Sequence, residues 1–524
     1  MTKDIYQFIP AAICPKEHGS NGIYVKYHPF REVAPYRKLY TPQGIWIDTP
    51  DRELYIVSDA GREGNTRPLN ENYDEYISLS PLHLTANDLN IKWSMVNYLQ
   101  NTNKEYDHNY MEKYSSLPEG DRKFKIMSDS GGFQLGRGSI NFINPEELAH
   151  WYHKNCDVGM SMDIPTGVHT DRSLLKTSAK IQQMNNNQMK GILKGLNSKT
   201  EIMNVIHGLN EKEQVEYHKA IFDPDLKKVS IAGMYRRSIF HATDLVYKLM
   251  FSDVGKHYDQ VHILGVFNNK ILPVYIWMFK LLNKSSKTHK LMTSDASTAI
   301  QQALSRTYLL ITEYDQSYYY QHLGLTNQRG HAKSINIPSA FRTLNCCCPV
   351  CSAVKYTDVF SFFHGRALID ALTIHNMWQM CQYGDYMNTM AQSLDFKDYR
   401  ELVKRQIGKR APRDTLDALD FVQNAYIGGV DKAEKKFSIY AGNTVKQYQT
   451  NSLFGDSAAG EAETAFVAAD RNHKLEEIFE TYRVYHKTGK APKTVKVQLV
   501  KKVGNLAHKS GSSNKKGKKM RKKL

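Results

Sequence analysis

Residues 128–134, Ser-Asp-Ser-Gly-Gly-Phe-Gln, combine a carboxylate, two hydroxyls, two glycines, an aromatic ring and an amide in one short stretch. Residues 124–127 before it are apolar enough to form a short buried strand, which puts Asp129 at the strand's carboxyl end. In parallel α/β sheets and barrels that end carries the chemistry. The glycines allow a flat ligand to approach closely, and Phe133 could stack on it. Taken alone, the stretch is equally compatible with a polar turn whose aspartate caps a helix.

Short apolar runs alternate with longer amphipathic stretches on both sides of this motif. The predicted strands are 124–127, 158–162, 202–206, 229–231, 262–266 and 290–293. The predicted helices include 145–154, 172–196, 211–221 and 272–282. Strand, polar loop and helix, repeated roughly every 30 residues, are typical of βα units on a parallel sheet. The pattern predicts an α/β fold and favours a (β/α)8 TIM barrel over an open sheet.

A polar or glycine-rich turn follows each predicted strand. These turns contain Asp129, Asp163, His207, Gly233, Gly265 and Asp295. Because the catalytic groups of a barrel come from the ends of several strands, the sequence predicts one active site at the carboxyl end of the barrel.

Four cysteines crowd into residues 346–351. The spacing Cys-x-Cys-x-x-Cys, with a histidine on the following predicted helix, indicates a closed tetrahedral zinc site of structural type. The predicted ligands are Cys346, Cys348, Cys351 and His375. His364 is an alternative fourth ligand, and Cys347 is expected to point away from the metal. The competing interpretation is a chance cluster of thiols.

The composition excludes several classes of protein. No apolar run approaches the roughly 20 residues that span a bilayer, and the first residues show no secretory signal. Seven cysteines in 524 residues do not make a disulfide scaffold. We therefore expect a cytoplasmic protein without membrane association.

The net charge of +17 is concentrated at one end of the chain. Residues 481–524 contain 15 Lys or Arg and no Asp or Glu, which leaves the remainder close to neutral. This segment is expected to be a disordered basic tail that attracts nucleic acid, although a solubilising or targeting tail has the same composition.

The same patterns predict four regions. Residues 1–340 would form the barrel, and 341–395 a zinc-binding subdomain inserted with a closing helix. Residues 396–480 would form a helical C-terminal region, and 481–524 the basic tail.

Residues 120–385 resemble the guanine transglycosylases, which exchange a guanine in nucleic acid for a 7-deazaguanine. Residues 129–134 match the family's Asp-Ser-Gly-Gly-Phe-Gln signature, and the cysteine cluster with its later histidine matches the family's zinc motif. The order of the two motifs along the chain is also that of the family.

The resemblance implies roles for individual residues. Asp129 would be the general acid/base, Asp295 the nucleophile that attacks C1′ of the sugar, and Asp163 the reader of the Watson–Crick edge of the base. Other base-binding residues implied are Ser130, Phe133, His207, Gly208, Gly233, Met234 and Leu264, with Phe133 and Leu264 on opposite faces of the base. The cofactor implied is one structural Zn²⁺ per chain.

The implied chemistry needs no redox cofactor. Base exchange without another energy source requires a covalent intermediate that preserves the free energy of the glycosidic bond. A carboxylate on C1′ provides that intermediate, as in retaining glycosidases. A second carboxyl can protonate the departing purine and deprotonate the incoming one.

Departures from the family pattern concern the substrate. His207-Gly208-Leu209 stands where the family has Gln-Gly-Gly, and Asp163 is followed by Ile-Pro where the family has an acidic residue and Cys. The Leu-Pro-Thr-Arg segment that bacterial members use on the tRNA anticodon is missing after Asp295, and the C-terminal part of the sequence does not resemble the RNA-binding barrel domain of archaeal members. These differences resemble the branch that modifies DNA, so we expect exchange of guanine in DNA for a base such as preQ0, with the target guanine flipped out or single-stranded.

Two other functions stay open. The first is the same reaction on tRNA. The second is a catalytically silent, zinc-stabilised nucleic-acid-binding subunit, which retention of both Asp129 and Asp295 disfavours. A helicase-like or other modification-system partner would open a duplex substrate.

Overall fold

The computed structural model describes residues 4–10, 24–25, 37–41, 44–49, 52–54, 77–78, 93–99, 125–136, 140–166, 171–234, 238–267, 269–296, 298–304, 307–314, 317–324, 348, 365–407, 413–440 and 465–492. All structural statements below concern these residues.

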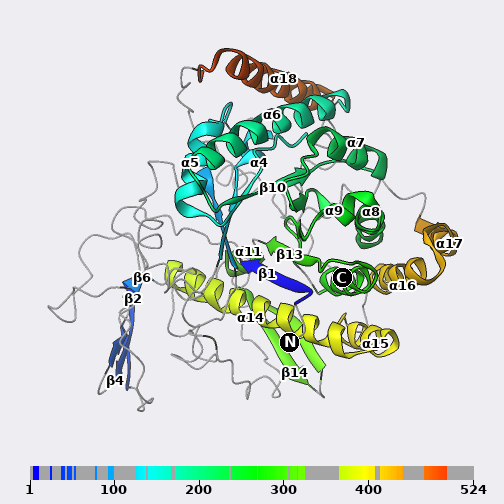
Figure 1. Ribbon diagram of the computed structural model, residues 1–524. Helices are drawn as coiled ribbons and strands as arrows, with labels where there is room; N and C mark the ends of the chain where they lie inside the picture. The colour runs from blue at the N-terminus through cyan, green and yellow to red at the C-terminus, as the bar shows by residue number, and fades with distance from the viewer. Residues whose placement is uncertain are drawn as a thin grey trace, which may run out of the picture.

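The centre of the molecule is an eight-stranded parallel sheet that curls into a TIM-like barrel (Figure 1). Its strands are β1 (Tyr6–Pro10), β7 (Trp93–Asn97), β8 (Lys125–Asp129), β9 (Val158–Met160), β10 (Glu201–Ile206), β11 (Lys228–Ile231), β12 (Gln260–Ile263) and β13 (Leu291–Ala296). Each strand from β7 to β13 pairs with the next, and β13 pairs with β1. The edge strands β1 and β7 also lie against each other. The predicted α/β, barrel-like fold is confirmed.

Strands β1 and β7 were absent from the sequence prediction, because the βα alternation is legible only from about residue 120. Between them the chain forms small antiparallel sheets. One consists of β3 (Arg37–Thr41), β4 (Gly44–Thr49) and β5 (Arg52–Leu54), and the other of β2 (Tyr24–Val25) and β6 (Ile77–Ser78). Non-local pairing of β1 with β13 leaves no periodic signal in the sequence around residue 6.

Helices follow the barrel strands. They are α4 (Gly132–Gly136), α5 (Pro145–Asn155), α6 (Ser173–Gly195), α7 (Glu211–Ile221), α8 (Ile239–Phe251), α9 (Asp253–His257), α10 (Leu272–Ser285) and α11 (Thr298–Leu304). Asparagine caps mark the N-termini of two of these helices. The Asn144 side chain accepts a hydrogen bond from Glu146 N at the start of α5, where Pro145 occupies the first turn, and the Asn210 side chain accepts one from Glu213 N at the start of α7. The bounds of α5, α6, α7 and α10, the helices predicted from the sequence, agree with that prediction to within three residues.

The barrel interior is partly filled by long apolar side chains. They are Met95, Met127, Val158, Met160, Met203 and Val205, with Ala232 and Leu264 packed against them. Successive members on one strand are two residues apart, which is the spacing of one face of a strand. Leu264, just beyond β12, therefore lies at the carboxyl end of this interior cluster.

A second group of helices covers the β1 side of the barrel (Figure 1). Helix α14 (Gly365–Ser393) lies on β1, where Asn388 Oδ1 accepts hydrogen bonds from Ile5 N and Tyr6 N at 3.0 and 3.2 Å. It also packs against α11 and the hairpin β14 (Thr307–Tyr314)–β15 (Ser317–Gly324). Helices α15 (Phe396–Ile407), α16 (Arg413–Gly428) and α17 (Val430–Lys436) continue this layer, followed by the short turn η3 (Ser438–Tyr440).

Helix α18 (Ala465–Thr488) packs on α6, away from α15–α17 (Figure 1). The helix continues to Thr488, past residue 481, where the basic segment of the sequence begins. Tyr482 is fully buried, and its hydroxyl bonds both the N–H and the carbonyl of Ile143. The helix extends beyond its last acidic residue because its apolar face is buried in the core. That face consists of Leu475, Ile478, Phe479 and Tyr482. Residues 493–524 of the predicted basic tail lie outside the described residues.

In the part of the chain that the structure describes, no helix is long and apolar enough to cross a membrane.

Candidate active site

The predicted active-site residues meet at the carboxyl end of the barrel. Asp129 is the last residue of β8, and Asp295 is the penultimate residue of β13. Asp163, His207 and Gly233 come shortly after β9, β10 and β11. Because parallel strands share one carboxyl edge, these positions line the same end of the barrel.

Asp129 is partly buried and accepts hydrogen bonds from two donors. Asn97 Nδ2 on the neighbouring strand β7 donates to Oδ2 at 2.7 Å, and the N–H of Gly131 donates to Oδ1 at 3.2 Å. Burial raises the pKa of Asp129 from 3.8 to about 6, and the nearby carboxylates of Asp163 and, to a smaller extent, Asp295 contribute to the rise. The two hydrogen bonds lower the pKa but do not cancel these effects. A carboxyl with such a pKa can both give and take a proton near neutral pH.

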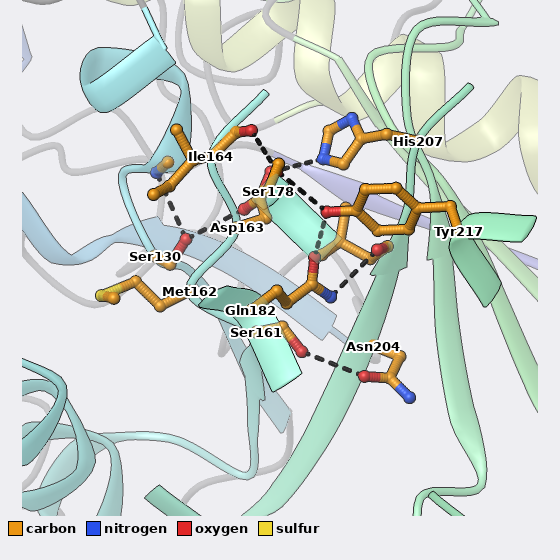
Figure 2. Close-up of polar contacts among 12 residues, drawn as sticks. Ser130, Ser161, Met162, Asp163, Ile164, Ser178, Gln182, Asn204, His207 and Tyr217 are labelled. Carbon is orange, nitrogen blue, oxygen red and sulfur yellow. Dashed lines mark hydrogen bonds and ion pairs between the residues drawn. The ribbon is translucent and has the colours of Figure 1, made fainter. Parts of the chain in front are cut away.

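Asp163 is the centre of a second cluster, shown in Figure 2. His207 Nε2 lies 2.8 Å from Oδ2 of Asp163, and Ser130 Oγ donates to Oδ1 at 3.3 Å. The side chains of Asp163 and His207 are only 11% and 10% exposed. Ser130 also accepts a hydrogen bond from the N–H of Gly132 at 3.2 Å, which links the cluster to the first motif.

Side chains from α6 and α7 lie next to this cluster (Figure 2). Ser178 Oγ donates to the carbonyl of Ile164 at 2.6 Å, beside Asp163. The Tyr217 hydroxyl donates to Gln182 Oε1 at 2.7 Å, and the Tyr217 ring meets the His207 ring edge-on, with centroids 5.4 Å apart. The buried partners therefore restrict both the loop that carries Asp163 and the orientation of His207.

Asp295 is bound at one of its two oxygens. The N–H of Gly265 donates to Oδ1 at 2.7 Å, and His262 Nε2 lies 3.1 Å from the same oxygen. Gly265 has φ +69, a left-handed conformation that suits glycine and turns its N–H toward the carboxylate. Among the described residues nothing donates a hydrogen bond to Oδ2.

The predicted base-contacting residues differ in what they expose. Phe133 is 42% exposed at the start of α4, and Leu264 is half-buried on the interior cluster. The side chain of Met234 is fully buried, so that its backbone alone could contact a ligand. Gly233 has φ +79 and open space where a Cβ would stand, whereas a Cβ on Gly208 would lie 2.7 Å from Gln214 N. Gly208 thus serves close packing against α7.

Sequence reasoning missed Asn97, His262 and Gly265 as partners of the two aspartates. Asn97 lies on a strand that the sequence pattern did not reveal. His262 did carry a signal, since it is an imidazole inside an otherwise apolar predicted strand. Gly265 belonged to a recognised turn, but only the tertiary structure brings its N–H to Asp295.

The predicted zinc ligands fall only partly within the described residues. Cys348 and His375 are fully buried, and Cys348 Sγ lies 3.3 Å from His375 Nδ1. Sulfur and nitrogen ligands on one tetrahedral zinc stand about 3.6 Å apart, so this pair fits two of the four positions. His375 Nε2 lies 2.7 Å from the carbonyl of Leu309, the usual second contact of a ligating imidazole.

Cys346, Cys351 and the alternative ligand His364 lie outside the described residues, as does Cys347. Within the described part of the chain, no three His, Cys, Asp or Glu side chains converge as a metal site would require.

No protein-family model matches the chain, and a search of curated proteins finds no match either.

Proposed function

We propose that this protein is a guanine transglycosylase that exchanges guanine in DNA for a 7-deazaguanine such as preQ0. The observation that carries the proposal is the pair of carboxyls at the carboxyl end of one barrel in contrasting environments. The pKa of Asp129 is raised to about 6, while Asp295 is bound at Oδ1 by two groups. Carboxyls set apart in this way suit an acid/base and a nucleophile.

In the first half of the reaction, Asp295 Oδ2 attacks C1′ of the target nucleotide. The bond between C1′ and the purine nitrogen breaks, and its electron pair leaves with the guanine. Asp129, in its protonated form, gives that base a proton. The products are an ester between Asp295 and C1′, free guanine, and ionised Asp129.

In the second half, the incoming deazaguanine enters the vacated pocket. Asp129 accepts the proton from the nitrogen of this base, which then attacks C1′. The ester bond to Asp295 breaks and the carboxylate is regenerated. Both aspartates end in the ionisation states in which they began, so the cycle needs no other reactant.

Recognition of the base is assigned to Asp163 and Phe133. The Watson–Crick edge of guanine presents donors that a carboxylate can accept, and Ser130 and His207 hold the Asp163 carboxylate from the protein side. The exposed ring of Phe133 offers a stacking surface, with Leu264 as the opposite wall. The backbone at Gly233 leaves room for the exocyclic substituent.

DNA is favoured over tRNA by the His207 imidazole in place of an amide, and by the lack, after Asp295, of the Leu-Pro-Thr-Arg segment that bacterial family members use on the tRNA anticodon. The retained Asp129, buried at a cost in stability, argues against a silent binding subunit. A structural zinc on Cys346, Cys348, Cys351 and His375 would tie residues 346–351 to α14 and take no part in the reaction. The basic tail would add affinity for the phosphate backbone.

The test is exchange by the purified protein. Single-stranded DNA, duplex DNA and tRNA are each incubated with preQ0, and their nucleosides are analysed by mass spectrometry. A denaturing gel, with the incoming base left out, detects the covalent adduct. We expect deazaguanine in DNA and an adduct that Asp295→Asn abolishes. Exchange in tRNA alone would overturn the choice of DNA, and absence of both exchange and adduct with every substrate would overturn the proposal.

A further inference from the structure

A chain of hydrogen bonds runs along β11, β12 and β13 to the carboxylate of Asp295. Lys228 Nζ donates to Gln260 Oε1 at 3.1 Å, and Gln260 Nε2 donates to Thr293 Oγ1 at 3.4 Å. Thr293 Oγ1 lies 3.0 Å from His262 Nδ1, and His262 Nε2 lies 3.1 Å from Asp295 Oδ1. The chain thus connects the first residues of β11 and β12 to the carboxyl end of β13.

Strand geometry explains why these side chains meet. Gln260 and His262 are two residues apart on β12, and Thr293 and Asp295 are two apart on β13, so each pair shares one face of its strand. His262 and Thr293 are direct partners in the β12–β13 ladder. Gln260 is 3% exposed and His262 and Thr293 are 0% exposed, so their polar atoms depend on one another rather than on bulk water.

The order of donors along the chain selects one tautomer of His262. The Lys228 ammonium can only donate, so the Gln260 amide turns its oxygen to Lys228 and its NH₂ to Thr293. The Thr293 oxygen accepts from that NH₂ and keeps its own proton to donate, and His262 Nδ1, 3.0 Å away, is within reach as the acceptor. With Nδ1 accepting, the neutral imidazole carries its proton on Nε2 and donates it to Asp295.

We propose that His262 is the positioning residue of the nucleophile, held by Gln260 and Thr293 in the tautomer that donates to Asp295 Oδ1. Together with the Gly265 N–H, it stops rotation of the carboxylate and keeps Oδ2 toward the sugar. The role in sugar attack rests on the proposed transglycosylase function. The tautomer and the hydrogen bond to Asp295 do not depend on it.

The first test compares two variants of similar size. His262→Met removes the donor, and His262→Gln puts an amide N–H near the position of Nε2. We expect single-turnover formation of the covalent adduct to slow by about 10- to 100-fold in His262→Met, with unchanged affinity for DNA, and most of the rate to return in His262→Gln. A wild-type rate in His262→Met would overturn the proposal, as would DNA affinity that falls in step with the rate.

A second pair of variants addresses the chain behind the imidazole. Thr293→Val keeps the shape of the side chain but removes the hydroxyl, and Thr293→Ser retains it. We expect slower adduct formation in Thr293→Val and a wild-type rate in Thr293→Ser. Equal rates in both variants would contradict the role of Thr293 in selecting the tautomer.

The last measurement separates this inference from the proposed function. In ¹⁵N-histidine-labelled protein, the signal that disappears in His262→Gln belongs to His262, and its nitrogen shifts report the tautomer. A proton on Nε2 supports the inference even if the wild-type protein forms no adduct, an outcome that would reject only the transglycosylase proposal. A proton on Nδ1 alone would overturn the inference.

Discussion

Gly132 lies so close to Asp163 that a Cβ on Gly132 would stand 2.3 Å from the Asp163 carbonyl oxygen and 2.5 Å from its Oδ1. The second glycine of the first motif therefore determines how closely the loops after β8 and β9 can approach. The position of the Asp163 carboxylate depends on this contact.

We predict that Gly132→Ala displaces Asp163 and weakens base binding. The clash is with backbone as well as side chain, so the loop must move, at a cost of about 1–3 kcal/mol in the free energy of unfolding. KM for the incoming base should rise by at least about tenfold, since the misplaced carboxylate is the proposed reader of its edge. Steady-state exchange and urea unfolding provide the two measurements.

Gly191→Ala is the matched control. Gly191 lies within α6, and a Cβ added there would meet nothing within 4 Å. Alanine at this position should raise the free energy of unfolding by about 0.5–1 kcal/mol and leave exchange unchanged. Similar effects of the two substitutions on exchange would argue against a specific contact at Gly132.

Asp129→Asn should make the protein more stable at neutral pH while abolishing exchange. The wild-type folded state, with the pKa of Asp129 raised from 3.8 to about 6, holds the proton more tightly than the unfolded chain. Its free energy of unfolding therefore falls as the pH rises from about 4 through 6, by up to about 3 kcal/mol from this group. Urea unfolding at a series of pH values measures this effect. The difference in free energy of unfolding between the asparagine variant and the wild type should grow over that interval and then level off.

Asp253→Asn serves as the control of opposite sign. Asp253 is exposed, and a hydrogen bond from Lys256 lowers its pKa. Its replacement should remove a small stabilisation that is present above the usual pKa of the group. If both variants changed with pH in the same direction, the raised pKa of Asp129 would be refuted.

The rate of adduct formation should depend on pH through Asp129. Departure of guanine needs the protonated carboxyl, whose fraction is one half at pH about 6 and falls tenfold for each further pH unit. Single-turnover measurements with DNA and no incoming base should therefore show a decline from pH 6 to 8. A rate that is flat or rising across this range would remove Asp129 from the role of acid.

Zinc removal should destabilise α14 and its neighbours. Cys348→Ser removes one ligand beside His375, so we expect the zinc content to fall well below one per chain and the melting temperature to drop. Cys347→Ser is the matched control, because this cysteine is predicted to point away from the metal. An equal zinc content in wild type and Cys348→Ser would reject the predicted ligand set. Loss of zinc in Cys347→Ser would show that Cys347 is itself a ligand.

The sequence by itself determined the strands β8 to β13 and four of the helices between them, α5, α6, α7 and α10. Apolar runs bounded by caps and glycine turns are local signals, so Glu211–Ile221 and the helices around it could be assigned from sequence alone. The same locality singled out Asp129, Asp163, His207 and Asp295, since a polar residue directly after a buried strand is legible in a single chain.

Only the tertiary structure decided how these residues act. The pairing of β1 with β13 joins residues nearly 300 positions apart, and no local pattern encodes such a contact. The pKa of Asp129 depends on burial and on Asp163, which belongs to another strand. The orientation of Asp295 depends on His262 and Gly265, brought to it across the β12–β13 ladder. Residue types mark the chemistry, but distances, dielectric environment and hydrogen-bond partners arise only when the barrel closes.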